Sequence, residues 1–332
     1  MSIKVICTGD LMLGENVHHF RRGIVRKFDG NYRNLLSDQV KAKLNEADFV
    51  LMNFEAGIAH DDDLKKMDID RAVYVAPFQS LDIFDGISSV VIGSVANNHF
   101  GQHGNDAAAK SIQLLNEKGI LLTGVSHLPL ILEKEGTKLC FYGVSLVKDK
   151  YFEGAYFKST YEDLITDLKL REKAENEIWL ISIHWGAEYY TIENPKQQQL
   201  AKKLADAGFD YIIGHHPHVV QPVRRSDKSV VFYSHGNFIF DQNFSSLTQK
   251  GLVSEINLPA GHTNLYMSQQ KKYKVVSFEP ISADELDSFC KRNFHQRKPL
   301  IMRIKMKLEL LFRFYELNLP IIKTFTTRMF KN

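Results

Sequence analysis

Short apolar runs rich in β-branched residues, each closed by small or polar residues, recur along this chain. A continuous apolar run of this length is typical of a strand buried on both faces of a sheet. The pattern predicts strands at Ile3–Cys7, Phe49–Met52, Val90–Val95, Ile178–Ile183, Tyr211–Ile213 and Val230–Tyr233. Longer stretches separate these runs, so the strands are expected to alternate with helices.

The stretches between the runs carry helix signals. Helices are predicted at Leu35–Ala47, Gly104–Lys118, Tyr161–Asn176 and Lys196–Ala207. Gly119 and Gly208 directly follow two of them, as glycines at helix C-termini do. Antiparallel strands are predicted as a hairpin within Ile131–Val144 and as a later pair of Gly251–Asn257 with Lys274–Glu279. Strands that alternate with helices predict an α/β fold with helices on the faces of a sheet.

Each of the six central strands is followed directly by polar side chains that can bind a metal or a substrate. They are Asp10; Asn53 and Glu55; Asn97, Asn98 and His99; His184 and Glu188; His215, His216 and His218; and His235 and Asn237. In open α/β sheets, ligands bind beyond the carboxyl ends of the strands. We therefore expect these side chains to converge on one site.

Carboxylate, amide and imidazole donors together suit divalent zinc, manganese or iron. Taken singly, a residue such as Asp10 could equally be a turn or helix cap. His216-Pro217-His218 is the strongest single signal, because two imidazoles at i and i+2 lie on one face of an extended segment. Two carboxylates and several histidines exceed the donors that one ion needs. The set therefore predicts a site for two divalent metal ions (Mn, Zn or Fe) that supports hydrolysis.

Six segments resemble, in the same order, the motifs of the bacterial CapA family, the capsule or poly-γ-glutamate synthesis proteins. They are GDLMLG, NFEAGI, ANNH, HWGAEY, GHHPHVVQP and GNFIFDQ, and they run from Asp10 to Gln242. The CapA family is a branch of the calcineurin-like metallophosphoesterase superfamily. The resemblance therefore implies a sandwich of mixed β-sheet with flanking helices and a metallophosphoesterase type of site.

The resemblance also implies a role for each motif residue. The implied metal ligands are Asp10, Glu55 as a bridging carboxylate, Asn98 through its amide oxygen, and the imidazoles of His184, His216 and His218. His99 corresponds to the catalytic proton donor, or to the residue that orients the oxygens of the transition state.

The chain departs from the superfamily pattern at one ligand. Met12 stands where a histidine is usual, two residues after the first aspartate, which puts the coordination of one metal ion in doubt. His235 could supply a substitute donor, and Glu188 is a further candidate. Arg224 could attract an anion or simply be solvated, and His215 is expected to be a spectator.

Two functions of different classes fit these residues. The first is a metal-dependent hydrolase that acts on a phosphoester or related bond in capsule or cell-surface polymer biosynthesis. The resemblance implies an anionic polymer or a phosphorylated substrate for it. The second is a non-catalytic assembly factor of a capsule or poly-γ-glutamate synthesis complex, with a structural or partly occupied metal site. Met12 favours the second function, and the Asn98-His99 pair favours the first.

Composition places the chain among ordinary globular proteins, with 332 residues of which 44% are hydrophobic and 24% charged. Its three cysteines are far apart and form no CxxC pair, which argues against a disulfide framework and a cysteine-based zinc site. The first apolar run is too short for a signal peptide, and no run reaches the length of a membrane span. A cytoplasmic location is expected, with or without peripheral contact at the inner membrane.

The C-terminal end differs in charge from the rest. From Lys291 onward there are 11 Lys/Arg and 2 Asp/Glu, a net charge of +9. Residues 1–290 carry 31 Lys/Arg and 37 Asp/Glu, a net charge of −6. We expect a CapA-type domain over 1–290 and a basic amphipathic helical tail over 291–332. The apolar spacing within Arg297–Lys331 suits either contact with a membrane surface or a capsule-synthesis complex, or docking on the acidic body. No recognised nucleic-acid motif accompanies this charge, so nucleic acid is not an expected partner.

Overall fold

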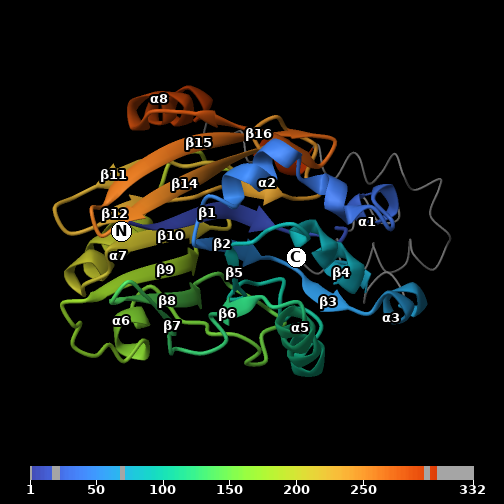
Figure 1. Ribbon diagram of the computed structural model, residues 1–332, viewed down its shortest axis with the longest axis horizontal. Helices are drawn as coiled ribbons and strands as arrows, with labels where there is room; N and C mark the ends of the chain where they lie inside the picture. Colours follow the sequence, from blue (N-terminus) through green and yellow to red (C-terminus); the bar gives the residue numbers. More distant parts are fainter. Residues whose placement is uncertain (1, 17–22, 68–71, 295–299, 305–332) are drawn as a thin grey trace.

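Two β-sheets stack face to face in the computed structural model, which describes residues 2–16, 23–67, 72–294 and 300–304 (Figure 1). Helices cover the outer faces of both sheets. The predicted fold class, a sandwich of mixed β-sheet with flanking helices, is confirmed.

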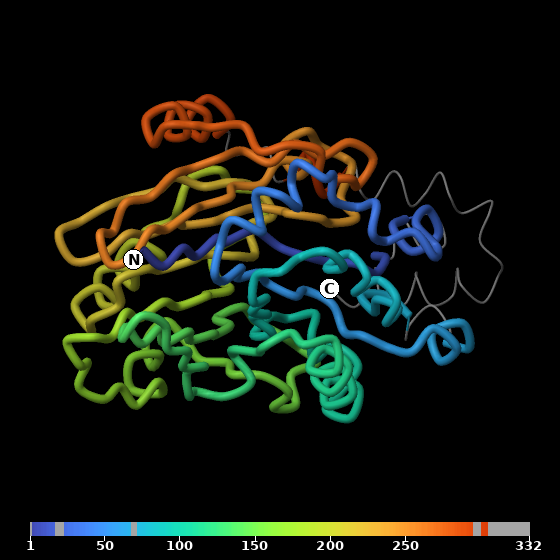
Figure 2. Tube along the Cα trace, in the orientation of Figure 1, coloured from blue at the N-terminus to red at the C-terminus, as the bar shows by residue number. Residues whose placement is uncertain are grey.

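The first sheet has eight strands and combines a parallel half with an antiparallel half. Its order is β16 (Lys274–Pro280), β15 (His262–Lys271), β14 (Lys250–Leu258), β1 (Ile3–Leu11), β2 (Phe49–Phe54), β5 (Val90–Ser94) and β6 (Leu121–Thr123), with β13 (Asn237–Ile239) paired to β1. Strands β1, β2, β5 and β6 are mutually parallel, so their carboxyl ends meet at one edge. Figure 2 shows β1 beside the late strand β14, which pairs with it antiparallel.

The second sheet has six strands. Its order is β11 (Val223–Arg225), β12 (Val230–Phe232), β10 (Tyr211–His215), β9 (Glu177–His184), β8 (Thr137–Ser145) and β7 (Leu130–Lys134). Strands β8, β9, β10 and β12 are parallel. A separate parallel pair is formed by β3 (Gly57–Ala59) and β4 (Val75–Pro77).

Alternation along the strands divides the core into layers. In β1, Val5 and Cys7 face the space between the sheets, whereas Ile6 faces the helices outside. The outer face of the first sheet packs on α2 (Asp38–Leu44) and α5 (Asn105–Glu117), and that of the second on α6 (Leu164–Asp167) and α7 (Pro195–Asp206). Because both faces of each central strand are buried, its sequence reads as a nearly continuous apolar run.

The remaining helical elements lie at the periphery of the sandwich. They are α1 (Ile24–Lys27), α3 (Asp61–Lys66), α8 (Ala283–Asn293) and the 3₁₀ helices η1 (Tyr32–Leu35) and η2 (Phe78–Phe84). Helix α8 begins with a capping box in which Ser282 and Glu285 satisfy each other's backbone N–H groups. It buries Leu286 and Cys290 in the core between the sheets.

The central strands and the hairpin of β7 with β8 form as predicted, but three other predictions are corrected. The first predicted helix begins only at Asp38, because Ser37 accepts a hydrogen bond from the backbone N–H of Val40 and caps it there. The predicted helix Tyr161–Asn176 is reduced to α6, and at Lys169 the backbone adopts a left-handed conformation (φ 46°) that ends it. Strands β14 and β16 do not pair with each other, since β15 lies between them.

The three cysteines are free and buried, which fits the absence of a disulfide framework. Within the described ranges, no helix combines the length and apolarity needed to cross a bilayer. The expected boundary between residues 290 and 291 falls inside α8. Most of the predicted basic tail, from residue 305 to 332, lies outside the described residues, so its amphipathic helix remains a prediction.

Candidate metal centre

The polar residues predicted from the strand ends meet where the carboxyl ends of the two sheets face each other. The first sheet supplies Asp10, Glu55, Asn98 and His99, and the second supplies His184, His215, His216 and His218. Asp10 Oδ1 of β1 lies 3.0 Å from His215 Nδ1 of β10, so the cluster spans the seam between the sheets.

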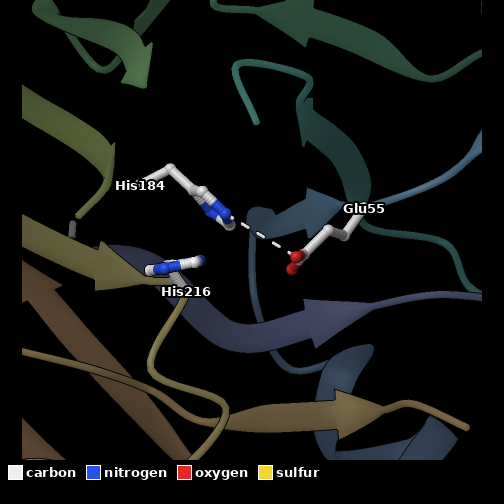
Figure 3. Close-up of side chains that lie close together, drawn as sticks. All are labelled: Glu55, His184 and His216. Carbon is white, nitrogen blue, oxygen red and sulfur yellow. Dashed lines mark ion pairs between the residues drawn. The ribbon is translucent and has the colours of Figure 1, made fainter. Parts of the chain in front are cut away.

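Among the residues that the structure describes, three groups of donors could hold a metal ion, because the ligand atoms within each group lie within 4.8 Å of one another. They are Asp10, Glu55 and His218; Glu55, His184 and His216; and Glu188, His216 and His218. Figure 3 shows Glu55, His184 and His216 pointing toward one another, with His184 Nε2 3.6 Å from Glu55 Oε1. Glu55 belongs to two groups, which is the arrangement that a bridging carboxylate requires.

Asp10 is fully buried and held from several sides. Asn53 Nδ2 donates to its Oδ1 at 2.9 Å, and His218 Nδ1 lies 3.3 Å from its Oδ2. Burial alone would raise the pKa of this carboxyl, but the hydrogen bonds from His215 and His218 bring it well below its ordinary value. Asp10 is therefore ionised, as a metal ligand must be.

Glu55 carries the opposite shift. Burial, followed by the negative charge of Asp10, raises its pKa well above the ordinary value. Its Oε1 is buried and has no hydrogen-bond partner, although the imidazoles of His184 and His218 lie 3.6 and 3.8 Å away. A buried carboxylate oxygen without a partner costs free energy. A divalent cation between Glu55 and Asp10 would remove both their repulsion and this cost.

The imidazoles of His184 and His216 are held neutral, the form that binds metal. Burial lowers the pKa of His216 to about 4 and that of His184 well below its ordinary value. Burial also acts on His218, but its hydrogen bond to Asp10 raises its pKa instead. A buried ring nitrogen of His216, Nδ1, has no hydrogen-bond partner. The donor chemistry and these unpartnered atoms fit one or two divalent cations.

The backbone around the histidines is in unusual conformations. His216 and His218 have φ of 95° and 57°, a left-handed region that side chains with a Cβ rarely occupy. Just before them, a Cβ on Gly214 would lie 2.1 Å from the carbonyl oxygen of Tyr233, so only glycine fits there. Such strain is found where the surrounding structure imposes it, commonly at functional sites.

Three asparagines connect the candidate ligands; the sequence placed them among the converging polar residues but assigned none of them an individual role. Asn53 Nδ2 also donates to Glu55 Oε2 at 3.2 Å, so one amide orients both carboxylates. Asn97 Nδ2 donates to Asn53 Oδ1 at 3.1 Å, and Asn237 Oδ1 lies 3.0 Å from His218 Nδ1. The available signal was their position near strand ends and close in sequence to a candidate ligand or proton-transfer residue: Asn53 lies near the end of β2, Asn97 follows β5, and Asn237 begins β13.

His99 lies at the rim of the cluster. Its ring stacks on Tyr74 with centroids 3.7 Å apart, and its Nδ1 is 3.0 Å from Gln102 Oε1. Its Nε2 is 4.0 Å from Glu55 Oε1. Burial lowers the pKa of His99 to about 4, despite the opposing effect of Gln102. Asn98 directly precedes His99 in the sequence, and its Oδ1 lies 3.0 Å from His184 Nε2.

The other candidates occupy different places. His215 was expected to be a spectator, yet its Nδ1 lies 3.0 Å from Asp10 Oδ1, so it contacts a candidate ligand. His235 belongs to none of the three donor groups of the described residues; it lies behind His215, and its Nε2 is 2.9 Å from Ser254 Oγ. Arg224 pairs with carboxylates outside the cluster, Asp287 at 2.8 Å and Glu193 at 3.3 Å. Met12 is buried in an apolar cluster with Ala56 and Phe240.

A buried set of carboxylates and imidazoles, shared between the ends of two sheets, defines a candidate metal centre. The sequence model of the family described as "Bacterial capsule synthesis protein PGA_cap" matches residues 4–242. The chain belongs to this family of bacterial capsule synthesis proteins.

Individual relatives agree with this assignment. The chain is 26% identical over 269 residues to "Capsule biosynthesis protein CapA" of Bacillus anthracis, covering 76% of this chain and 63% of that protein. It is 27% identical over 258 residues to "PGA biosynthesis protein CapA" of Bacillus subtilis, covering 74% and 65%. The matched region thus spans somewhat less than two thirds of either relative. The crystal structure of TT1561 of Thermus thermophilus is similar over 80% of this chain and 98% of that chain, with 11% identity and a TM-score of 0.46.

Proposed function

We propose that this chain is a metal-dependent hydrolase that cleaves a phosphoester or related bond during capsule or cell-surface polymer biosynthesis. The observation that carries the proposal is the position of Glu55, shared by two donor groups and faced by His99 across the cluster. A shared carboxylate suits two cations a few ångströms apart, and a neighbouring imidazole suits proton transfer.

Asp10, Glu55 and His218 would hold one cation, and His184 and His216, again with Glu55, the other. When bound, divalent Mn, Zn or Fe at such a site supplies Lewis acidity toward a phosphoryl or carbonyl oxygen and activates water. Asn53 keeps both carboxylates oriented, because its amide donates to each of them.

His99 would carry the proton transfer through its Nε2. Gln102 Oε1 can only accept a hydrogen bond, so the proton of the neutral ring lies on Nδ1. This leaves Nε2 free on the side of the ring that faces Glu55. Stacking on Tyr74 fixes the plane of the ring, so that a proton can be taken up and released at one defined position.

The substrate we propose is an anionic polymer or a phosphorylated intermediate of its synthesis. The printed names of the Bacillus relatives, which refer to capsule and PGA biosynthesis, support this choice. A basic C-terminal tail that contacts a membrane surface or a synthesis complex, and a cytoplasmic location with peripheral contact at the inner membrane, complete the proposal. Nucleic acid is not a proposed partner.

The second candidate is a non-catalytic assembly factor, and one observation favours it. Met12 stands among Ala56 and Phe240 instead of offering a metal ligand. One of the two cations would therefore have fewer protein donors, and a partly occupied site could serve assembly alone.

Turnover by the metal-loaded protein tests the two candidates. The protein is stripped with a chelator, reloaded with Mn, Zn or Fe, and assayed on phosphodiester, phosphomonoester and γ-glutamyl amide panels. The His99→Ala variant should keep its metal and lose about 10²–10⁴-fold in kcat, the usual contribution of a positioned proton-transfer group. No turnover by the wild-type protein on any panel, together with normal polymer production in cells that carry His99→Ala, would support the assembly factor instead.

A further inference from the structure

Residues 300–304 lie against the metal centre, although they are far beyond the region that matches the family. Met302 is 3% exposed and packs with Tyr189, Val219 and Leu247. Tyr189 directly follows the candidate ligand Glu188, and Val219 directly follows His218. Met302 therefore packs on the two loops that follow strands of the second sheet and carry its candidate metal ligands.

Arg303, the next residue, directs its charge at the cluster. Its Nη2 lies 3.6 Å from Glu188 Oε2, and Glu188 shares a donor group with His216 and His218. Toward the rest of the described chain, Arg303 donates no hydrogen bond, and its side chain is 57% exposed. A guanidinium has five N–H donors in a fixed fork, so most of its binding capacity is open to a ligand.

This charge is distinctive within the site. Among the described residues, Arg303 is the one Lys or Arg that forms an ion pair with a member of the three donor groups. By contrast, the ion pairs that Asp10 and Glu55 form within the described residues are with histidines. An exposed Arg–Glu pair at 3.6 Å contributes little to stability. Fixing the position of Glu188 is therefore a poor explanation for the presence of a guanidinium beside the cluster.

We propose that Arg303 binds an oxyanion of the substrate, a phosphate or a carboxylate, beside the metal ligands, and that Met302 seats it there. The planar fork of arginine matches both groups and binds them through paired hydrogen bonds. Arg303 thereby selects anionic over neutral substrates. The link to hydrolysis rests on the function proposed above, whereas anion binding can be measured separately.

The test is calorimetric titration of the manganese-loaded full-length protein with two probes, inorganic phosphate and N-acetylglutamate. For the probe that the wild-type protein binds, Arg303→Gln should weaken binding by about tenfold to a hundredfold, as expected for lost hydrogen bonds to a charged group. Arg303→Lys keeps the positive charge but lacks the planar fork of the guanidinium. Its affinity for the probe should therefore lie between those of the wild-type protein and Arg303→Gln. Met302→Ala should weaken binding in the same direction by unseating the segment.

Arg224→Gln is the matched control, because Arg224 is similarly exposed at 42% and also pairs with carboxylates, but outside the cluster. It should bind both probes as the wild-type protein does. The probe that responds to Arg303→Gln shows whether the oxyanion is a phosphate or a carboxylate.

Unchanged binding in Arg303→Gln overturns the inference, as does the absence of binding of either probe by the wild-type protein. Loss of manganese from Arg303→Gln also overturns it, since Arg303 would then be a brace for Glu188. If binding is lost in Arg303→Gln but the wild-type protein turns over no substrate, the hydrolase proposal fails and the anion site stands. If turnover is present, Arg303→Gln should raise KM more than it lowers kcat.

Discussion

Replacing His216 by alanine should abolish most of the metal affinity. His216 belongs to two of the three donor groups, with Glu55 and His184 on one side and with Glu188 and His218 on the other. Its buried Nδ1 has no hydrogen-bond partner among the described residues, so the substitution breaks no hydrogen bond of this atom with them. The variant therefore removes a donor from the metal site while breaking few contacts elsewhere.

The expected magnitude follows from the place of this ring in the cluster. Changes to residues that only orient metal ligands already reduce affinity by about 10–100-fold. Loss of a ligand itself should reach at least the upper end of this range. A hundredfold loss corresponds to about 2.7 kcal/mol. Wild-type protein at a hundredfold excess of metal over Kd should gain a similar amount of stability, and His216→Ala should lose most of this gain.

The assay is chelator competition for manganese and zinc, followed by thermal unfolding with and without metal. His235→Ala is the matched control, because His235 is also a fully buried imidazole near the cluster but belongs to none of the described donor groups. It should lower the stability of the metal-free protein while keeping the wild-type affinity for metal. Equal losses of affinity in both variants, or none in His216→Ala, would refute the assignment of the ligands.

Two further outcomes follow from residues around the site and from the second sheet. His215→Ala should weaken metal binding by about 10–100-fold, as a residue that orients the ligand Asp10 does, and an unchanged affinity by chelator competition would return His215 to the status of a spectator. The hydrogen bond from Arg171 lowers the pKa of Glu177 from 4.5 to about 2, so this carboxylate contributes stability that is fully present above pH 4.5 and lost as pH falls toward 2. Because Arg171 is 46% exposed, Glu177→Gln should cost about 1–2 kcal/mol at pH 7, and denaturant titrations should show the difference shrinking at pH 3.

The sequence predicted the part of the fold that depends on uninterrupted burial. Strands such as β1 and β10 bury apolar side chains on both faces, and each apolar run reaches a boundary near the carboxyl end of its strand, where the polar residues begin. The same boundary places the candidate ligands at the strand ends, so their convergence could be foreseen from one sequence.

Other features depend on contacts that the local sequence does not reveal. Strand β15 is half-exposed and lacks a continuous apolar run, so it was missed and its neighbours were paired wrongly. His215 contacts Asp10 through its ring and His216 contacts it through its backbone N–H, and no local pattern in the sequence distinguishes these two roles. Arg303 lies 115 residues after Glu188 in the chain, and no local pattern indicates their contact.

The position of the cluster across the seam between the sheets gives a bound cation a mechanical role as well. Asp10 belongs to the first sheet and His218 follows the second, so one ion held by both would clamp the two halves of the sandwich together. Pulling the sheets apart would then require breaking coordination bonds in addition to exposing the core. Because His99 belongs to none of the donor groups of the described residues, His99→Ala should leave this fastening intact even if it abolishes turnover.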